Sequence, residues 1–280
     1  MNGKQKITLI GAGVMGEAFI AGLVRNNLAG ETQITASDPL ESRRIDLEKK
    51  YGILTSEDNA SAAKNADVVI LAVKPQHLKK VMSSLCKCLR SDALVMSIVA
   101  GAKTELIGEG LEHLNVVRVM PNTPAQIGEG ISVWTASSSV SPEQKELAKE
   151  ILSSLGHEIF LEDENYLDMA TALSGTGPAY AFLFMEAMID AGVHMGFPRY
   201  IAEKLVIQTM RGSVEYYDLK KAHPASLRNE VTSPGGTTAA ALYYLEKAGF
   251  RTAISRAIWA AYERSQKLGR GKNSQPPDSD

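Results

Sequence analysis

The stretch Ile7-Thr8-Leu9-Ile10-Gly11-Ala12-Gly13-Val14-Met15-Gly16 decides the fold of this chain. A short apolar run stops at Gly11, and a helical pattern extends from Gly16 to Arg25. The first glycine permits a tight turn, the second lets the backbone approach a pyrophosphate, and the third lets the helix pack closely on the strand. A strand, a glycine turn and a helix in this order predict a dinucleotide-binding site, with the anion at the N-terminus of the helix.

Short β-branched runs alternate with helical segments through the first half of the chain. The predicted strands are 7–10, 33–36, 67–73, 93–99 and 115–120, and the predicted helices are 16–25, 41–50, 76–89 and 103–111. This alternation predicts an α/β domain with a doubly wound, mostly parallel, Rossmann-type sheet. Two further runs, 131–135 and 158–161, are predicted to be edge strands on either side of a helix that Ser141 caps.

The character of the sequence changes near Asp163, after which only helical patterns follow, over 177–192, 198–222, 235–248 and 250–268. We therefore predict a dinucleotide-binding domain over 1–162, an all-α C-terminal domain for substrate binding and oligomerisation over 163–269, and a disordered polar tail over 270–280. Segment 180–188 is apolar almost all round, which predicts a helix packed between subunits. The alternative is the core helix of a monomer.

Composition excludes several classes of protein. The chain has 280 residues with 30 Lys and Arg against 32 Asp and Glu, so it lacks the basic surplus of a nucleic-acid-binding protein. No apolar run reaches the ~18 residues of a membrane span, and residues 1–6 lead into the first strand without a signal-peptide core. Cys86, Cys88 and the five scattered histidines form no metal-binding pattern. We expect a cytoplasmic enzyme or small-molecule binder without a nucleic-acid, membrane or metal partner.

Residues after the predicted strand 33–36 bear on the choice of cofactor. Ser37-Asp38 falls where the adenosine ribose of a dinucleotide should lie. Asp38 would favour the unphosphorylated ribose of NADH, whereas Ser37 with Arg43 and Arg44 would hold the 2′-phosphate of NADPH. The two arginines could also be solvated helix residues. On balance we predict NADPH, with NADH as the alternative.

Three further segments are candidates for the cleft. Ala72-Val73-Lys74-Pro75 ends the strand 67–73, where Lys74 either contacts the cofactor or is an exposed loop lysine. The stiff loop 118–125 either lines the cleft, which we favour, or is a structural turn. Segment 173–180 interrupts a helical pattern with two glycines and a proline, which indicates a hinge or a close approach of ligand to backbone.

The turn Ser233-Pro234-Gly235-Gly236-Thr237-Thr238 leads directly into a predicted helix. Exposed amides, the helix dipole and three hydroxyls predict a site for a carboxylate or a phosphate. The alternative is an elaborate N-cap with nothing bound.

These motifs occur together, in order, in a known family. The glycine turn, Ala72 to Pro75, Met120-Pro121-Asn122-Thr123-Pro124, the segment 173–180 and Ser233 to Thr238 resemble those of the pyrroline-5-carboxylate reductases, over about residues 6–268. The resemblance implies NAD(P)H-dependent reduction of the cyclic imine 1-pyrroline-5-carboxylate to L-proline, in proline biosynthesis. It also implies dimers with interleaved C-terminal helices, assembled further into decamers.

The resemblance also assigns site residues. The implied cofactor contacts are Gly11, Ala12, Gly13, Val14, Met15, Gly16, Ser37, Asn59, Ala72, Val73, Lys74 and Pro75, to which the ribose argument adds Arg43. The implied substrate contacts are Glu164, Ser233, Gly236, Thr237 and Thr238, with Thr238 beside the imine and the carboxylate held by the loop from Ser233. One departure is that Ser37-Asp38-Pro39 stands where many members carry Asn-Arg, which leaves the preferred cofactor open.

The reaction that the resemblance implies needs little acid–base catalysis by the protein. A protonated imine accepts hydride at carbon, so the protein mainly positions the reactants and clamps the carboxylate. The first rival function is a 3-hydroxyacid dehydrogenase, which would need a catalytic lysine in the first long helix of the second domain; 177–196 contains none. The second is a cofactor-sensing binding protein without catalysis, against which the intact loop Ser233 to Thr238 argues.

Overall fold

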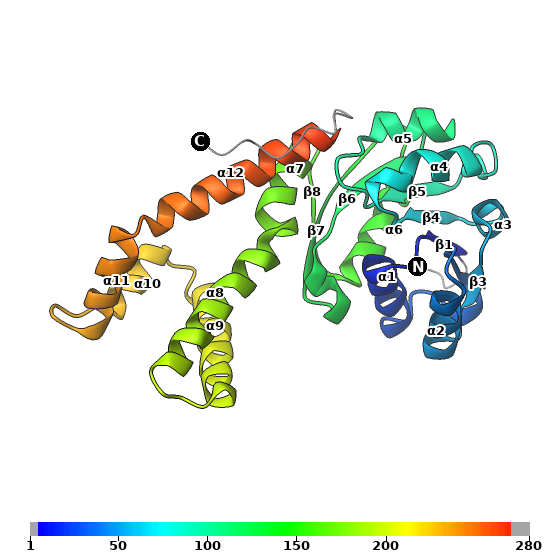
Figure 1. The fold of residues 1–280 in the computed structure, drawn as a ribbon. Coiled ribbons are helices and arrows are strands. Elements are labelled where there is room, and N and C mark those ends of the chain that lie inside the picture. Colours follow the sequence, from blue (N-terminus) through cyan, green and yellow to red (C-terminus); the bar gives the residue numbers. More distant parts are fainter. Residues whose placement is uncertain (1–4, 270–280) are drawn as a thin grey trace. The chain divides into compact units, whose positions relative to one another are not determined.

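A single eight-stranded sheet organises the computed structural model of this chain, which describes residues 5–269 (Figure 1). The strands are β1 (Ile7–Ile10), β2 (Ile34–Ser37), β3 (Leu54–Ser56), β4 (Val68–Leu71), β5 (Leu94–Ser97), β6 (Val116–Met120), β7 (Gly130–Ala136) and β8 (Gly156–Phe160). Their order is β3-β2-β1-β4-β5-β6-β7-β8, and every neighbouring pair is parallel except β6 and β7. The predicted doubly wound, mostly parallel sheet is confirmed.

Helices cover both faces of this sheet because apolar side chains alternate along its buried strands. Ile7 and Leu9 of β1 pack in one core cluster, and Ile10 packs in another. The first cluster contains residues of α1 (Val14–Arg25), α2 (Glu41–Tyr51) and α6 (Pro142–Ser153). The second contains residues of α3 (Asn59–Ala63), α4 (Pro75–Leu85) and α5 (Thr104–Leu111). The strand order reverses between β1 and β4, which is where such sheets bind ligands.

Two sequence predictions within this region need correction. Segment 131–135 was expected at an edge, but β7 lies between β6 and β8, and Val133 and Trp134 are buried there. The helix expected over 76–89 ends at Leu85, because the backbone turns at Cys86 and Lys87 takes a positive φ of 61°. The sequence analysis also missed β3 and α3, which are shorter than the windows that periodicity resolves. The remaining short elements here are the 3₁₀ turns η1 (Glu31–Gln33) and η2 (Thr123–Ile127).

The predicted interruption over 173–180 is present but confined. Helix α7 (Tyr166–Ala170) continues into a π-helical turn, η3 (Thr171–Gly175), and α8 (Gly177–His194) begins after Thr176. The amide of Thr176 donates to the carbonyl of Thr171 at 2.8 Å, a bond that spans five residues. Gly175 lies against Met120 so closely that a Cβ at this position would overlap the Met120 side chain. A larger residue at this position would need the flexible end of the Met120 side chain to shift, so Gly175 marks a close approach of η3 to β6.

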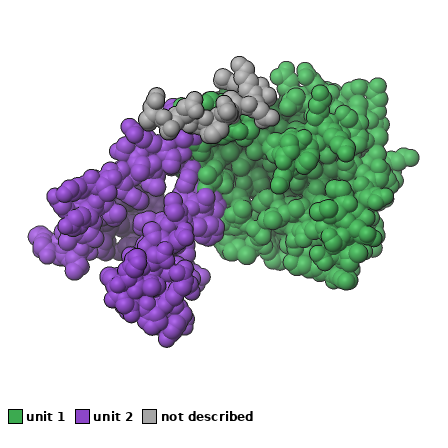
Figure 2. Space-filling view, in the orientation of Figure 1, with its two compact units in different colours: residues 1–176, 261–280 green, residues 177–260 purple. Residues whose placement is uncertain are grey.

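The chain divides into two compact units, residues 1–176 with 261–280, and residues 177–260 (Figure 2). The first unit extends past the predicted boundary at 162/163, to Thr176, although the last strand, β8, stops at Phe160 and every later element among the described residues is helical. Helix α12 (Phe250–Gly269) begins in the second unit and ends in the first. The tail predicted to be disordered, 270–280, lies outside the described residues.

The second unit is all helical, as predicted. It contains α8, α9 (Arg199–Lys220), α10 (Pro224–Glu230), α11 (Thr237–Lys247) and the first half of α12. Helices α8 and α9 form a hairpin in which Gly192 lies against Ala202. The short helix α10 was not expected; Pro224 opens it, and the Nδ1 atom of His223 accepts a hydrogen bond from the Ala225 amide at 3.1 Å.

Segment 180–188 of α8 is not the core of a single chain. Phe182 and Leu183 are 63% and 67% exposed, and no residue from Tyr180 to Met188 is buried. The unit as a whole buries little apolar side chain beyond Ala202 and Val206. A unit of this size needs a core to be stable, and its large apolar side chains remain at its surface. The monomer-core alternative is therefore wrong, and this surface fits burial against another chain.

Candidate active site

The glycine turn after β1 is fixed by its packing against the turn after β4. Gly11 has a φ of 91° and donates its amide to the Ser37 carbonyl at 2.8 Å. A Cβ on Gly11 would lie 2.8 Å from the carbonyl oxygen of Ala72, and one on Gly16 would overlap the Gly11 carbonyl. The protein's own backbone thus requires glycine at positions 11 and 16.

Gly13 differs from these two glycines, because a Cβ there would meet nothing within 4 Å. It is the N-cap residue of α1, and no side chain caps this helix. The start of α1 is therefore uncapped by any side chain, and its N-cap residue has free space around the position of a Cβ. This arrangement fits the backbone approach and the anion binding that a dinucleotide pyrophosphate requires.

Three of the predicted cofactor residues meet at the carboxyl end of β2. The buried Ser37 hydroxyl donates to Asn59 Oδ1 at 2.7 Å, at the start of α3. The Asp38 carboxylate accepts hydrogen bonds from the amides of Ala12 and Leu40, each at 3.0 Å. Both oxygens of Asp38 thus hold the turn in shape, which leaves this carboxylate less available to ribose hydroxyls.

Arg43 and Arg44 also converge on this end of the site, from the first turn of α2. Arg43 donates from Nε to the Ala12 carbonyl at 2.6 Å and forms an ion pair with Glu17 of α1. Arg44 donates to the Asp38 carbonyl at 2.8 Å and lies 3.7 Å from the exposed carboxylate of Glu57. Neither arginine is a freely solvated helix residue, so that alternative is wrong.

The Glu17 carboxylate organises this corner electrostatically. Partial burial raises its pKa, but hydrogen bonds from Lys50, Arg43 and Tyr51 outweigh burial and hold the pKa at about 2. The same contacts raise the pKa of Lys50. The pKa of Tyr51 is raised by burial and by its hydrogen bond to Glu17. Glu17 is therefore ionised at every pH at which the protein is expected to work.

Acid should remove the stabilisation that Glu17 provides. Its pKa falls from the ordinary value of 4.5 to about 2 on folding, so the contribution is complete above pH 4.5 and is lost as the pH falls towards 2. We expect Glu17→Gln to lower the urea midpoint of unfolding at neutral pH, and this deficit to shrink as acid is added. The matched variant Glu41→Gln, at an exposed position of α2, should show no such pH dependence. A Glu17→Gln deficit that is unchanged by acid would contradict the assignment.

The turn after β4 forms the next part of the site. The Ala72 amide donates to the Ile10 carbonyl at 2.8 Å, which aligns this turn with the glycine turn. Lys74 is exposed at the N-cap of α4, and Pro75 is the first residue of that helix. The side chain of Lys74 makes no hydrogen bond to the described residues, so it is available to a ligand but is not fixed by the protein.

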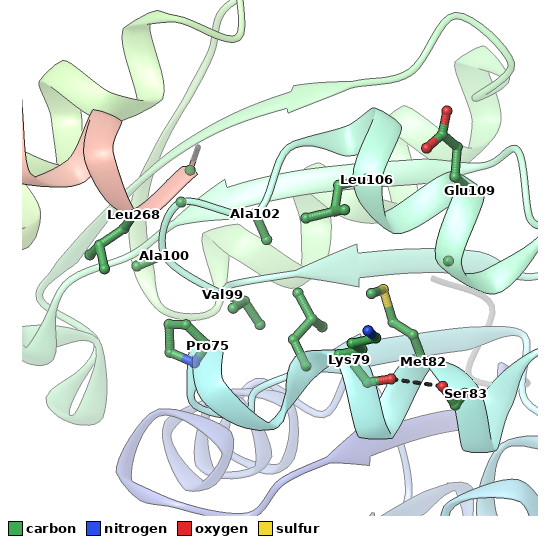
Figure 3. Close-up of a pocket in the computed structure, with 14 residues that line it drawn as sticks. Pro75, Lys79, Met82, Ser83, Val99, Ala100, Ala102, Leu106, Glu109 and Leu268 are labelled. Atoms are coloured by element: carbon green, nitrogen blue, oxygen red, sulfur yellow. Dashed lines mark hydrogen bonds between the residues drawn. The ribbon is translucent and has the colours of Figure 1, made fainter. Parts of the chain in front are cut away.

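A cavity of about 630 Å³ lies beyond this turn, between α4 and α5 (Figure 3). Most side chains that line it are apolar, including those of Leu78, Met82, Val99 and Leu106, and among the described residues Lys79 and Glu109 are the charged ones in its lining. The cavity does not include the glycine turn. The candidate site is therefore the glycine turn, where no side chain caps the start of α1.

A buried ionic cluster that the sequence analysis missed surrounds Glu164. Arg118 of β6 is 3% exposed and donates to Glu164 at 3.2 Å and to Asp168 of α7 at 3.0 Å. Glu164 also accepts hydrogen bonds from the amide and the hydroxyl of Thr104 at the start of α5, at 2.8 and 3.2 Å. Ser265 of α12 donates to Asp168 at 2.8 Å. Glu164 thus has a structural role of its own in the sheet-containing unit.

The cluster could have been suspected from the sequence, since Arg118 is a charged residue with apolar neighbours on both sides in the strand run 115–120. A buried charge needs a partner, but sequence spacing does not say which acidic residue supplies it. The loop that follows is held by a side chain. Asn122 accepts from the Ile131 amide at 3.0 Å and donates to the Ser174 carbonyl at 3.3 Å, so this side chain stabilises the turn. That the loop also lines the cleft stays a prediction.

The loop Ser233 to Thr238 belongs to the helical unit. Gly235 takes a positive φ of 71°, and the Gly236 amide donates to the Ser233 carbonyl at 3.1 Å. Gly236 is the N-cap of α11, and no side chain caps the helix. No hydroxyl of Ser233, Thr237 or Thr238 caps the first amides of α11, so the side-chain cap of the alternative interpretation is absent. Anion binding at this loop stays a prediction. Glu164 and the cofactor residues lie in the other unit.

Two absences within residues 5–269 complete the description. No helix there has the length and apolarity needed to cross a membrane. No group of three or more His, Cys, Asp or Glu side chains in that range is placed to hold a metal ion.

Family models match both halves of the chain. Residues 6–101 match the model described as "NADP oxidoreductase coenzyme F420-dependent", and residues 164–268 match "Pyrroline-5-carboxylate reductase dimerisation". With a dinucleotide-type sheet and an open glycine turn, these matches define an NAD(P)-dependent oxidoreductase that forms homo-oligomers.

Similarity to individual proteins extends over nearly the whole chain. A pyrroline-5-carboxylate reductase of Synechocystis is 43% identical over 95% of this chain and 98% of its own length. One of Pseudomonas aeruginosa is 41% identical over 94% of this chain and 96% of its own length. The crystal structure of Plasmodium falciparum pyrroline carboxylate reductase with NADP bound matches with a TM-score of 0.88 and 33% identity, over 95% of this chain and 99% of that one. The chain belongs to the pyrroline-5-carboxylate reductase family.

This membership confirms the resemblance found in the sequence. It also excludes the first rival function, the 3-hydroxyacid dehydrogenase, because full-length relatives at this identity carry the reductase name. The second rival, a binding protein without catalysis, finds no support among these relatives.

Proposed function

We propose that this protein reduces 1-pyrroline-5-carboxylate to L-proline, the last step of proline biosynthesis, with a reduced nicotinamide dinucleotide as the hydride donor. One observation carries the proposal. The chain matches reductases of this family over more than nine-tenths of its length, and each of its units keeps an uncapped helix N-terminus at a glycine-rich turn. One turn suits the cofactor pyrophosphate and the other suits the substrate carboxylate.

In the sheet-containing unit, the amides at the start of α1 would hold the pyrophosphate. Ser37 and Asn59, already joined by a hydrogen bond, would position the adenosine ribose, and Ala72 to Pro75 would border the remainder of the cofactor. When bound, the cofactor supplies the hydride that the imine carbon accepts. The open space beside Gly13 is the feature of this chain that admits it.

In the helical unit, the amides of Gly236, Thr237 and Thr238 with the Ser233 hydroxyl would hold the substrate carboxylate. Thr238 would hydrogen-bond the ring nitrogen, which carries a proton before hydride arrives and becomes an amine afterwards. The C=N π bond breaks, a C–H bond forms, and the nitrogen keeps its proton, so no protein base is needed. Positioning and electrostatics then account for most of the rate enhancement.

The reaction is tested by following NADPH oxidation with 1-pyrroline-5-carboxylate, and NADP⁺ reduction with 3-hydroxyacids as the comparison. We expect oxidation with formation of proline in the first assay and no reaction in the second. Turnover of 3-hydroxyacids without turnover of the imine would refute the proposal.

We further propose that NADPH is the preferred cofactor. Asp38 uses both carboxylate oxygens on backbone amides, whereas Arg43 and Arg44 bring two guanidinium groups to the same end of β2. A carboxylate so engaged is a poor acceptor for two ribose hydroxyls, and guanidinium groups suit a phosphate. This combination supports NADPH over NADH.

Replacing both Arg43 and Arg44 with alanine should therefore raise the Michaelis constant for NADPH at least ~10-fold, the loss expected for charge-assisted contacts. The constant for NADH should change much less, because NADH lacks the 2′-phosphate. Lys49→Ala is the matched control, since it removes a cation from the exposed end of the same helix. Equal losses with both cofactors would show that the arginines support the turn and do not read the phosphate.

Assembly and location complete the proposal. The exposed apolar surface of α8 is proposed to form the dimer interface, and further association into decamers is proposed on the resemblance alone. The cytoplasmic location expected from the sequence is part of the same proposal.

A further inference from the structure

Three donors converge on the Glu17 carboxylate in the first turn of α1. Lys50 Nζ lies 2.7 Å from Oε1, the Tyr51 hydroxyl donates to the same oxygen at 2.9 Å, and Arg43 pairs with Oε2. Arg43 lies near the start of α2, whereas Lys50 and Tyr51 end it. One carboxylate therefore ties both ends of α2 to α1.

This carboxylate occupies an unusual place for an anion. It lies in the first turn of the helix whose N-terminal amides are open for a pyrophosphate. Two cations surround it, so the cluster keeps one positive charge in excess. Glu17 therefore does not make this corner negative. Repulsion of a ligand phosphate would not explain why three donors converge on its carboxylate.

The geometry of Arg43 shows what the carboxylate achieves. Nε is fixed on the Ala12 carbonyl at 2.6 Å, and Nη2 is fixed on Glu17. Nη1 makes no hydrogen bond to any of the residues that the structure describes. Because a guanidinium is a rigid planar fork, fixing two of its nitrogens also fixes the direction of the third.

We infer that Glu17 is a positioning residue for cofactor selection, which holds the Arg43 guanidinium beside the glycine turn with one amino group left for the additional phosphate of NADPH. This inference rests on the proposal that Arg43 reads that phosphate. The benefit is preorganisation. A long side chain that is ordered during folding loses no further freedom when the ligand binds.

Glu17 could instead only neutralise the charge of Arg43. The two roles predict opposite changes in phosphate binding when the Glu17 charge is removed, so the direction of that change decides between them. If Glu17 only neutralised Arg43, removing its charge would strengthen binding of any phosphate at this corner. If Glu17 positions Arg43, removing its charge releases the guanidinium and weakens recognition of the 2′-phosphate. Adenosine 5′-monophosphate lacks the 2′-phosphate, so the affinity for adenosine 2′,5′-bisphosphate divided by the affinity for the monophosphate isolates this contact.

The experiment is titration calorimetry of these two nucleotides with the full-length protein, without imine or turnover. We expect Glu17→Gln to lower the affinity for the bisphosphate about 10-fold relative to the affinity for the monophosphate. This is the effect expected for one charge-assisted hydrogen bond. In an Arg43→Ala background, Glu17→Gln should change the ratio no further, because the two residues act as one unit. Glu41→Gln, an equal change of charge on exposed α2 surface, should leave the ratio as in the wild type.

Tyr51→Phe provides a second test that alters no charge. It removes one donor from Glu17 and should shift the ratio in the same direction by a smaller factor, even if Glu17→Gln proves too unstable to purify. An unchanged or increased preference for the bisphosphate in Glu17→Gln and Tyr51→Phe overturns the inference. If Arg43→Ala itself leaves the ratio unchanged, the proposed role of Arg43 fails, and the inference about Glu17 fails with it. If Arg43→Ala lowers the ratio but Glu17→Gln and Tyr51→Phe do not, the role of Glu17 is refuted and the role of Arg43 stands.

Discussion

Replacing Thr238 with alanine should lower the turnover number for imine reduction by about 10- to 1000-fold, the range for loss of one positioned donor or proton-transfer group. The Michaelis constant for the imine should move less, because the backbone amides at the start of α11 and Ser233 still hold the carboxylate. Affinity for the cofactor should hardly change. The hydrogen bond to the ring nitrogen matters most as that nitrogen becomes an amine, so its loss appears chiefly in turnover.

In the structure, removing the Thr238 hydroxyl breaks no hydrogen bond to the described residues, so the substitution tests the reaction without disturbing the fold. This hydroxyl also does not cap α11. Thr238→Ala should therefore leave the melting temperature close to that of the wild type. Thr252→Ala, an exposed threonine of α12, is the matched control and should retain full activity.

Ser233→Ala should show the reverse bias, with weaker substrate binding and a milder effect on turnover. Steady-state kinetics over a range of imine concentrations separates the two effects. Turnover of Thr238→Ala at the wild-type rate would show that Thr238 only begins a helix, and the catalytic assignment would then be wrong.

Leu183→Glu should convert the homo-oligomer into an inactive monomer. Leu183 is 67% exposed in a single chain, so a glutamate there costs an isolated chain little. In an interface between copies of the chain, the same change buries an unpaired charge, at a cost of several kcal/mol. In a two-fold symmetric interface the substitution is present in both subunits, so two such charges are buried.

The chain offers a matched control at Leu114 in the sheet-containing unit, which is 74% exposed. Leu114→Glu makes the same substitution away from the helical unit and should leave the assembly intact. Light scattering after size exclusion measures the mass of each variant. An active Leu183→Glu protein of unchanged mass would exclude this part of α8 from the interface.

Much of the sheet-containing unit follows from the sequence because its signals are local. Each buried strand is a short apolar run that ends at a glycine, a proline or a polar residue. The glycine turn can be predicted for the same reason, since its three glycines lie within six residues between a strand and a helix and Gly16 packs on Gly11 itself, although the contact of Gly11 with Ala72 is distant along the chain. Segments without such local signals, such as β3 and α3, were missed.

The parts that the sequence did not predict depend on partners that are distant along the chain. That Arg118 pairs with Asp168 and Glu164 cannot be derived from spacing, and neither can the position of β7 inside the sheet. Asn122 carries the right chemistry for a cleft, yet its amide serves two backbone groups from different segments. Arg43 was predicted as a cofactor residue from its charge. The Glu17 carboxylate that orients it was not predicted, because in the sequence Glu17 looks like any other polar residue of a helix.

The buried cluster around Asp168 also constrains the order in which the protein can mature. Asp168 and Ser265 are separated by 97 residues, and both are almost fully buried in the finished unit. During synthesis the sheet strands and Arg118 emerge first, and the helical residues 177–260 must follow before Ser265 is available. The hydrogen bond from Ser265 to Asp168 therefore cannot form before synthesis has reached residue 265. Until then the ion pair between Arg118 and Asp168 lacks one of the donors that surround it in the folded unit.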